Sequence, residues 1–242
     1  ERTASTGLAV ALALDLALPA AAQPAPDTLA AVRERGVVTC GVTPSTLGFA
    51  QPDANGVWRG IDVDYCRAVA AAVLGDANKV RFVTPTTATR FPVLQSGEID
   101  ILLRTTTWTM SREATLGAAF VGVSMYDGQG FMVKRSSNIS TLRQLDGSTI
   151  CLLPGTTTET ITAEYFRGHG MRCTPLSVPT IEALREAFLA DRCNVYTLDL
   201  SALAAFRASR GAEADQFVLL PDVISKEPLG PAVRQGDWRW FN

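Results

Sequence analysis

Residues 80–103, with the sequence VRFVTPTTATRFPVLQSGEIDILL, decide the fold class. The apolar, β-branched run at 80–84 predicts a strand, residues 89–96 predict a helix, and the apolar run at 101–103 predicts a second, buried strand. A strand, a helix and a strand joined by short connections are typical of a parallel sheet that is covered by helices. This stretch therefore predicts a βαβ unit.

The residues before this unit extend the same pattern. Residues 27–35 begin with a capping aspartate and are followed by a glycine, which predicts a short helix. The apolar run at 37–42 predicts a buried strand, Asn55-Gly56 predicts a hairpin turn, and 62–74 predict a helix. The first half of the chain is therefore predicted to form one α/β lobe.

The second half repeats this order. Strands are predicted at 149–153, 173–178 and 194–198, and each precedes a predicted helix, at 157–167, 181–190 and 200–210. The fold class expected is α/β, with two lobes that each contain a mostly parallel sheet flanked by helices.

The expected boundaries put lobe 1 at 24–131, lobe 2 at 132–224 and an incomplete return toward lobe 1 at 225–242. In open parallel sheets ligands bind beyond the carboxyl ends of the strands, so the cleft between the lobes is the expected site.

Composition narrows the class of function. The 242 residues are 47% hydrophobic and 19% charged, which is ordinary for a globular protein. A net charge of -2 without basic runs argues against a nucleic-acid partner. The single histidine, His169, excludes a mechanism with two imidazoles and makes a His-rich zinc site improbable. No cofactor and no metal is expected.

The first 23 residues resemble a secretory signal. Arg2 precedes an apolar run at 8–19, and three alanines follow at 20–22. The run is too short to span a bilayer, and Asp15 within it is unusual for a signal. A mobile alanine-rich linker is the alternative. The preferred interpretation is a signal remnant at 1–23, which implies export and an oxidising compartment.

Five cysteines can pair in such a compartment, and an odd number leaves at least one unpaired or paired between chains. One bridge in each half is expected, Cys40–Cys66 and Cys151 with either Cys193 or Cys173. No CxxC spacing occurs, which makes a metal site the weaker interpretation.

Polar residues follow the predicted strands where the cleft should lie. Arg112 offers a planar fork for a carboxylate, and Asp199 can accept from an ammonium group. Hydroxyl and N–H groups that suit an anion come from two loops, with Thr105, Thr107, Thr156 and Thr157. A carboxylate and an ammonium on one carbon describe an α-amino acid.

Each of these residues also has a purely structural interpretation. Arg112 can be a surface residue with a local partner, the threonines at 156–158 can simply cap a helix, and Asp199 can be the N-cap of the helix that follows. The ligand-binding interpretation gains weight because all the sites fall at strand ends of both lobes.

Several longer motifs carry a resemblance. They are GIDVDYCRAVAAA (60–72), RF (90–91) with LQSG (94–97), TTWTMSR (106–112), YDGQGF (126–131), GTTTE (155–159) and SKEPLG (225–230). From about residue 29 to its end the chain resembles the type II periplasmic amino-acid-binding proteins of ABC transporters, and most closely the general L-amino-acid-binding branch.

The resemblance implies roles for individual residues. Arg112 would clamp the ligand α-carboxylate, with Thr107 and the backbone around Thr105 assisting from lobe 1 and Thr156 and Thr157 from lobe 2. Asp199 stands at the family's ammonium-binding aspartate. The neutral Thr43 is compatible with a broad or uncharged side-chain preference.

Three departures from the family pattern stand out. Thr105 occupies a position where this branch more often has asparagine, and Asn194 one where relatives usually have aspartate. Family members also continue well beyond residue 242, so lobe 1 is expected to lack part of its wall and to expose apolar surface.

The function implied is binding without chemistry. A periplasmic, monomeric receptor would capture L-amino acids of several kinds, close about hinges near 131–133 and 225–229, and deliver its ligand to a membrane permease. The same fold can serve as a periplasmic dehydratase, for which Asp199 or Glu159 would supply the general acid. A truncated copy that does not bind is a further alternative. The sequence leaves the preferred amino acids and the permease open.

Overall fold

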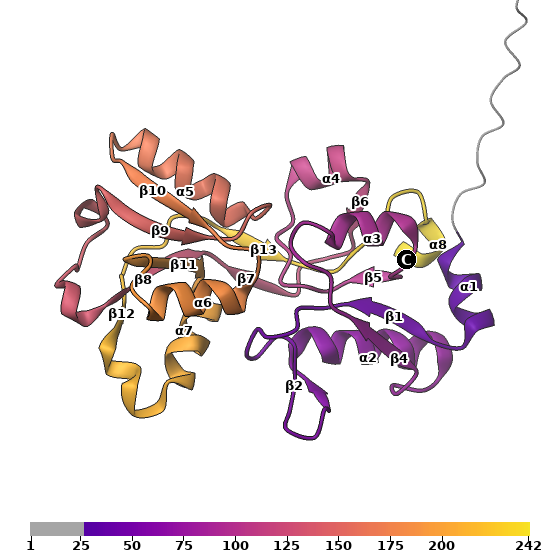
Figure 1. Ribbon diagram of the computed structural model, residues 1–242. Coiled ribbons are helices and arrows are strands. Elements are labelled where there is room, and N and C mark those ends of the chain that lie inside the picture. The colour runs from indigo at the N-terminus through magenta and orange to yellow at the C-terminus, as the bar shows by residue number, and fades with distance from the viewer. Residues whose placement is uncertain (1–26) are drawn as a thin grey trace, which may run out of the picture.

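Two five-stranded sheets, each with its own helices, form the body of the protein in the computed structural model, which describes residues 27–242 (Figure 1). The signal remnant expected at 1–23 lies outside the described residues. The two sheets belong to two lobes that lie side by side, with connecting strands between them (Figure 1).

The first sheet has the strand order β4-β1-β5-β14-β6. β1 pairs in parallel with β4 and β5, whereas β14 pairs antiparallel with β5 and β6. Its strands are β1 (Val38–Gly41), β4 (Val80–Val83), β5 (Ile101–Leu102), β6 (Ala118–Phe120) and β14 (Ala232–Arg234). The same lobe contains α1 (Thr28–Arg35), α2 (Ile61–Leu74), α3 (Arg90–Ser96), α4 (Met110–Leu116), α8 (Trp238–Phe241) and the hairpin of β2 (Gln51–Pro52) and β3 (Trp58–Arg59).

The second sheet has the order β10-β9-β11-β8-β12. β9 lies parallel to β10 and β11, and β8 pairs antiparallel with β11 and β12. Its strands are β8 (Gln129–Lys134), β9 (Ser148–Leu152), β10 (Cys173–Ser177), β11 (Val195–Asp199) and β12 (Phe217–Leu219). Its helices are α5 (Thr157–Gly168), α6 (Ile181–Leu189), α7 (Leu200–Ser209) and the 3-10 turns η1 (Arg135–Ser137), η2 (Leu142–Leu145) and η3 (Gly211–Gln216).

The chain crosses between the lobes on a separate two-stranded ribbon. β7 (Met125–Asp127) and β13 (Glu227–Leu229) pair antiparallel between the two sheets (Figure 1). Phe131, Met132 and Val133, where one hinge is expected, are fully buried within β8 of the second sheet, and the position of the hinge stays a prediction. β8 also begins at Gln129, three residues before the boundary expected for lobe 2.

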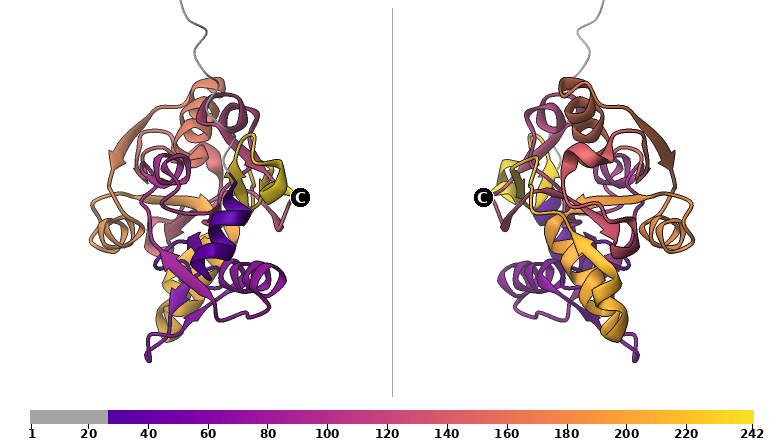
Figure 2. Two further views of the ribbon diagram at one scale, coloured as in Figure 1. Left: turned by 90° about the vertical axis from the view of Figure 1, so that its right-hand side faces the viewer. Right: turned by 90° about the vertical axis from the view of Figure 1, so that its left-hand side faces the viewer.

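Local signals explain most of the helix ends. Asp27 caps α1 by accepting from the N–H of Ala30, and Gly36 ends this helix in the left-handed conformation. The end of the chain returns to the same place: α8 lies against α1, and Asp237 accepts from the N–H of Thr28 at 2.9 Å (Figure 2). Lobe 1 is thus assembled from segments at both ends of the described residues.

Two disulfides tie strands to their neighbours. Cys40 of β1 bonds to Cys66 of α2, as expected, and Cys151 of β9 bonds to Cys193. Of the two partners that the sequence left open for Cys151, the structure selects Cys193. Cys173 on β10 is free and half-buried.

Apolar side chains line an open hollow on lobe 1. Val69 and Val73 of α2, Val121 beyond β6 and Trp240 of α8 surround a space of about 400 Å³. None of the helices among residues 27–242 is long and apolar enough to cross a membrane.

Removal of the Cys151–Cys193 bridge tests its contribution to stability. The bridge spans 42 residues, so changing both cysteines to alanine should lower the free energy of unfolding by about 2–5 kcal/mol. Urea unfolding under oxidising conditions measures the change. Cys173→Ala is the control, because it leaves both bridges intact. An equal loss in the two variants would contradict this role of the bridge.

Candidate functional site

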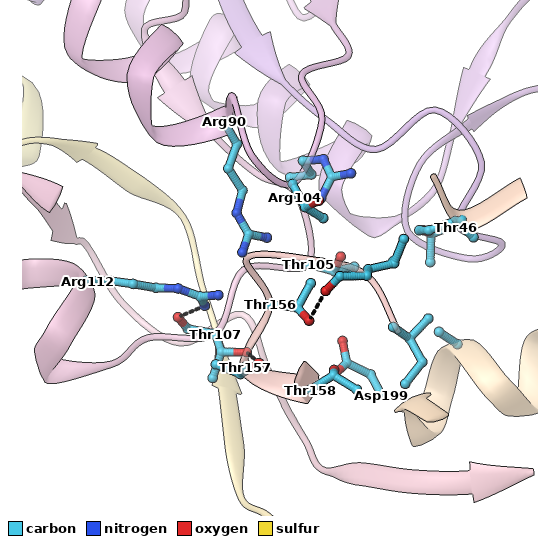
Figure 3. Close-up of a pocket in the computed structure, with 15 residues that line it drawn as sticks. Thr46, Arg90, Arg104, Thr105, Thr107, Arg112, Thr156, Thr157, Thr158 and Asp199 are labelled. Carbon is cyan, nitrogen blue, oxygen red and sulfur yellow. Dashed lines mark hydrogen bonds between the residues drawn. The ribbon is translucent and has the colours of Figure 1, made fainter. Parts of the chain in front are cut away.

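A pocket lies where the carboxyl ends of the parallel strands of both sheets face each other (Figure 3). All six residues expected at the site line this inner pocket: Thr105, Thr107, Arg112, Thr156, Thr157 and Asp199. The other lining residues are Thr46, Thr87, Arg90, Arg104, Leu153, Thr158, Ile181, Leu198 and Ala202. The structure therefore brings together side chains that are far apart in the sequence.

Arg112 is held rigidly at one end of this inner pocket. It is the third residue of α4, whose N-cap Thr109 accepts from the Arg112 N–H at 3.2 Å. Its Nη1 donates to the carbonyl oxygen of Thr107 at 2.6 Å, and its guanidinium lies over the ring of Phe91. Arg112 is only 7% exposed, and this burial lowers its pKa while Glu227 and Asp199 act to raise it. It is not a surface arginine with a solvated partner.

Asp199 ends β11 and begins α7, but its side chain does not cap the helix. Within the described residues no hydrogen-bond donor reaches its carboxylate, which points into the inner pocket (Figure 3). Burial raises the pKa of Asp199 well above its usual value, and Glu227 and Asp127 raise it further. A cation placed beside Asp199 would reverse this penalty, because it would stabilise the charged carboxylate.

Thr156 and Thr157, at the start of α5, make different hydrogen bonds. Thr156 is the N-cap: its hydroxyl accepts from the N–H of Glu159 at 3.2 Å and donates to the carbonyl oxygen of Leu153 at 2.8 Å. The structural interpretation therefore applies to the Thr156 side chain. Thr157 instead donates its hydroxyl to Glu227 at 2.9 Å. The N–H groups of Thr157 and Thr158, which precede Glu159 in the first turn of α5, have no acceptor within the helix and are suited to an anion.

Thr105 has an unusual backbone. Its φ of 42° lies in the left-handed region, which threonine rarely adopts. The Thr105 N–H donates to Oδ2 of Asp62 at 3.1 Å. Asp62 is buried in the first turn of α2, and burial raises its pKa to about 7. A strained turn next to a buried carboxyl group therefore forms part of the pocket wall.

Sequence reasoning missed two further arginines of the inner pocket. Arg90, the first residue of α3, is 3% exposed, and its Nη2 donates to the carbonyl oxygen of Gly155 in lobe 2 at 3.0 Å. Arg104 is 6% exposed, its Nε donates to the carbonyl oxygen of Pro85 at 2.8 Å, and burial lowers its pKa to about 10. Arg104 directly follows the strand predicted at 101–103. This position at the end of a buried strand could have identified it as a candidate site residue.

The third residue that was missed, Glu227, lies beneath the inner pocket on β13. It is 1% exposed and accepts from the hydroxyls of Thr107 at 2.6 Å, Thr157 at 2.9 Å and Ser225 at 2.8 Å. Thr107 belongs to lobe 1 and Thr157 to lobe 2, so this carboxylate connects both lobes. The motif at 225–230 contains Glu227, but no pattern in the sequence indicates its hydrogen-bond partners.

The lining of the inner pocket is predominantly positive. Three arginines, Arg90, Arg104 and Arg112, face a single lining carboxylate, Asp199. Residues 27–242 contain no group of three or more histidine, cysteine, aspartate or glutamate side chains that could hold a metal ion. The arrangement suits a small ligand with more negative than positive charge.

Residues 38–240 match the model of the bacterial extracellular solute-binding proteins, family 3. The chain belongs to this family. Together with the relatives and the solved structure described next, this match confirms the resemblance to amino-acid-binding proteins of ABC transporters and the two-lobe fold class.

Two curated relatives are similar over most of the chain. The glutamate/glutamine/aspartate/asparagine-binding protein BztA of Rhodobacter capsulatus is 50% identical over 88% of this chain, and the general L-amino acid-binding periplasmic protein AapJ of Rhizobium johnstonii is 49% identical over 89%. The chain spans 63% of the length of each of these relatives. Both are named as binding proteins, not as enzymes.

A solved structure from Brucella ovis, described as an ABC transporter/periplasmic binding protein with glutathione bound, is 48% identical to this chain. The match covers 89% of this chain and 68% of that one, with a TM-score of 0.85.

The strain at Thr105 predicts a stabilising substitution. Asparagine tolerates the left-handed conformation better than threonine, so Thr105→Asn should raise the free energy of unfolding by about 1 kcal/mol. Thr174→Asn is the control, because Thr174 is an exposed residue of β10 where asparagine gains nothing. Chemical unfolding measures both variants. A loss of stability in Thr105→Asn would contradict the strain.

The buried Asp62 predicts a pH dependence. Its pKa in the folded protein is about 7 against an ordinary value of 3.8, so between these values the folded state holds a proton that the unfolded chain releases. This contribution to stability is complete at low pH and is lost as the pH rises through 7, by up to about 4 kcal/mol. Asp62→Asn cannot ionise and should become more stable relative to the parent protein between pH 5 and pH 8. Parallel stability curves for the two proteins would refute the raised pKa.

Proposed function

We propose that this chain is an extracytoplasmic receptor that captures L-amino acids for an ABC transporter. The observation that carries the proposal is the pairing of Arg112 and Asp199 in one pocket, contributed by different lobes. A buried guanidinium with donors to spare and a buried carboxylate without a donor match the two charges that every free α-amino acid carries. Fixed opposite charges of this kind select such a ligand over simple acids or amines.

In this proposal the α-carboxylate of the ligand binds Arg112 and the first-turn N–H groups of α5, and its ammonium group binds Asp199. The ligand contacts both lobes only when the cleft is closed, so its binding free energy favours the closed form. Delivery to a membrane permease would follow from recognition of that form. The family description as extracellular solute-binding proteins supports a location outside the cytoplasmic membrane. A monomeric state and the periplasm are part of the proposal.

The positive charge of the inner pocket favours particular side chains. Arg90 and Arg104 remain beside the ligand after Arg112 has bound the α-carboxylate. We therefore expect acidic amino acids and their amides to bind more tightly than apolar ones, within a broad preference. The name of the Rhodobacter relative, which lists glutamate, glutamine, aspartate and asparagine, supports this expectation.

Binding is favoured over catalysis by the position of the acidic groups. Of the two general acids that the sequence offered for a dehydratase, Glu159 does not line the inner pocket, and its Oε2 accepts from the N–H of Gly155 at 3.0 Å. Asp199 is left as a single acid opposite three arginines. A non-binding copy is the other alternative, and the complete set of charged groups argues against it.

Two substitutions test the two charges separately. Arg112→Met should weaken L-glutamate binding by roughly 100-fold, since it removes one partner of a buried charge pair. Asp199→Asn should weaken L-glutamate far more than glutarate, which lacks the amine and keeps both carboxylates. Titration calorimetry measures both ligands, and circular dichroism verifies the fold of each variant. Equal losses for glutamate and glutarate in Asp199→Asn would refute the role of Asp199.

A further inference from the structure

A second cavity, here called the side chamber, adjoins the inner pocket between the lobes. It measures about 170 Å³, whereas the inner pocket measures about 40 Å³. Arg104 and Ile181 line both cavities. The side chamber is otherwise formed mainly by Ser45, Thr84 and Pro85 of lobe 1 and by Pro179, Thr180 and Glu182 of lobe 2.

Contacts between the lobes close this chamber on one side. The Ser45 hydroxyl donates to Glu182, and Nη2 of Arg185 donates to the carbonyl oxygen of Ser45 at 3.1 Å. Because each contact joins lobe 1 to lobe 2, the side chamber exists only while the lobes are together. The side chamber is therefore part of the closed binding site and not a depression on the surface of one lobe.

The inner pocket is too small to contain a long ligand. One water needs roughly 10–15 Å³ of such a cavity, so about 40 Å³ has room for only three or four groups of that size. The carboxylate, ammonium and α-carbon of an amino acid already use this space. The side chain must continue away from Arg112, toward Thr46 and Arg104 at the opposite end (Figure 3).

Arg104 stands where the two cavities meet. Its Nε donates to Pro85, but neither Nη atom has a hydrogen-bond acceptor within residues 27–242. Arg104 is only 6% exposed, so its guanidinium gains a favourable hydrogen bond where an acceptor approaches it through the cavity. A carbonyl or carboxylate oxygen of a ligand that passes from the inner pocket into the side chamber would supply this acceptor.

We propose that the side chamber is a subsite for groups attached to the side chain of the bound amino acid, and that it admits γ-glutamyl peptides. The inference rests on the proposed function, because Arg112 and Asp199 must first hold the free α-carboxylate and α-ammonium. A peptide linked through its α-carboxylate lacks one of these groups. A peptide linked through the γ-carboxylate keeps both, presents its amide oxygen to Arg104, and extends its second residue into the side chamber.

The ligand test uses three compounds and the 242-residue chain. Titration calorimetry compares L-glutamate, γ-L-glutamylglycine and its isomer α-L-glutamylglycine, none of which has a thiol that could reduce the disulfides. L-glutamate and the γ-isomer should bind with affinities within about tenfold of each other, and the α-isomer should not bind. If glutamate binds and the γ-isomer does not, the side-chamber proposal is wrong and the receptor function stands. If neither binds, both proposals fail.

A filled chamber provides the second test. Thr84 lines the side chamber but not the inner pocket, and its hydroxyl makes no hydrogen bond within residues 27–242. Thr84→Trp should weaken the γ-isomer at least about tenfold and leave glutamate within about threefold. Thr84→Ala, which enlarges the chamber, and Thr174→Trp, the same change on the exposed β10, should leave both ligands unaffected.

Equal effects of Thr84→Trp on both ligands, or none on either, would overturn the proposal. If this variant does not fold, the two isomers still test the proposal on the unchanged protein. Equal affinities for γ- and α-glutamylglycine would show that no γ-specific path exists.

Discussion

One buried carboxylate determines how the two lobes meet. Glu227 lies on β13 of the ribbon between the lobes. Its carboxylate accepts hydrogen bonds from the hydroxyls of Thr107 in lobe 1 and Thr157 in lobe 2. A buried carboxylate is tolerable only with such donors, so both threonines are drawn to one point. Thr107 also provides the carbonyl oxygen that holds Arg112, and Thr157 opens α5. The positions of the clamp and of the helix terminus opposite it therefore both depend on Glu227.

The backbone reinforces this arrangement. The N–H of Trp108 donates to the carbonyl oxygen of Pro228 at 2.7 Å, and the N–H of Gly230 donates to that of Thr106 at 3.0 Å. The loop that contains Thr107 is thereby fixed alongside β13. Glu227 also acts through space, because its charge opposes lowering of the pKa of Arg112 and raises that of Asp199. The same carboxylate thus favours the charged form of Arg112 and disfavours the charged form of Asp199 unless a cation lies beside it.

The parts of the site that could be predicted follow a simple rule of topology. Arg112 and Asp199 come after buried strands whose hydrophobic runs are plain in the sequence, and parallel strands deliver such residues to one edge. Arg90 was not identified as a site residue because it lies in the first turn of a helix, where an arginine is usually solvated. Glu227 was not identified because its strand has only three residues, which are too few to show the alternation of apolar and polar residues that is typical of a strand. The short strands β6, β7 and β14 were missed for the same reason. β8 is buried on both faces, which is the pattern of a strand inside a sheet.

The hydrogen bonds that join the two lobes have a consequence for the free energy of closure. Arg90 reaches Gly155, Ser45 reaches Glu182, and Glu227 receives a hydroxyl from each side. Under the proposed function, these bonds add to the contacts that a bound ligand makes with both lobes, because they form only when the lobes are together. Since they do not involve the side chain of the ligand, they would contribute equally for chemically different amino acids.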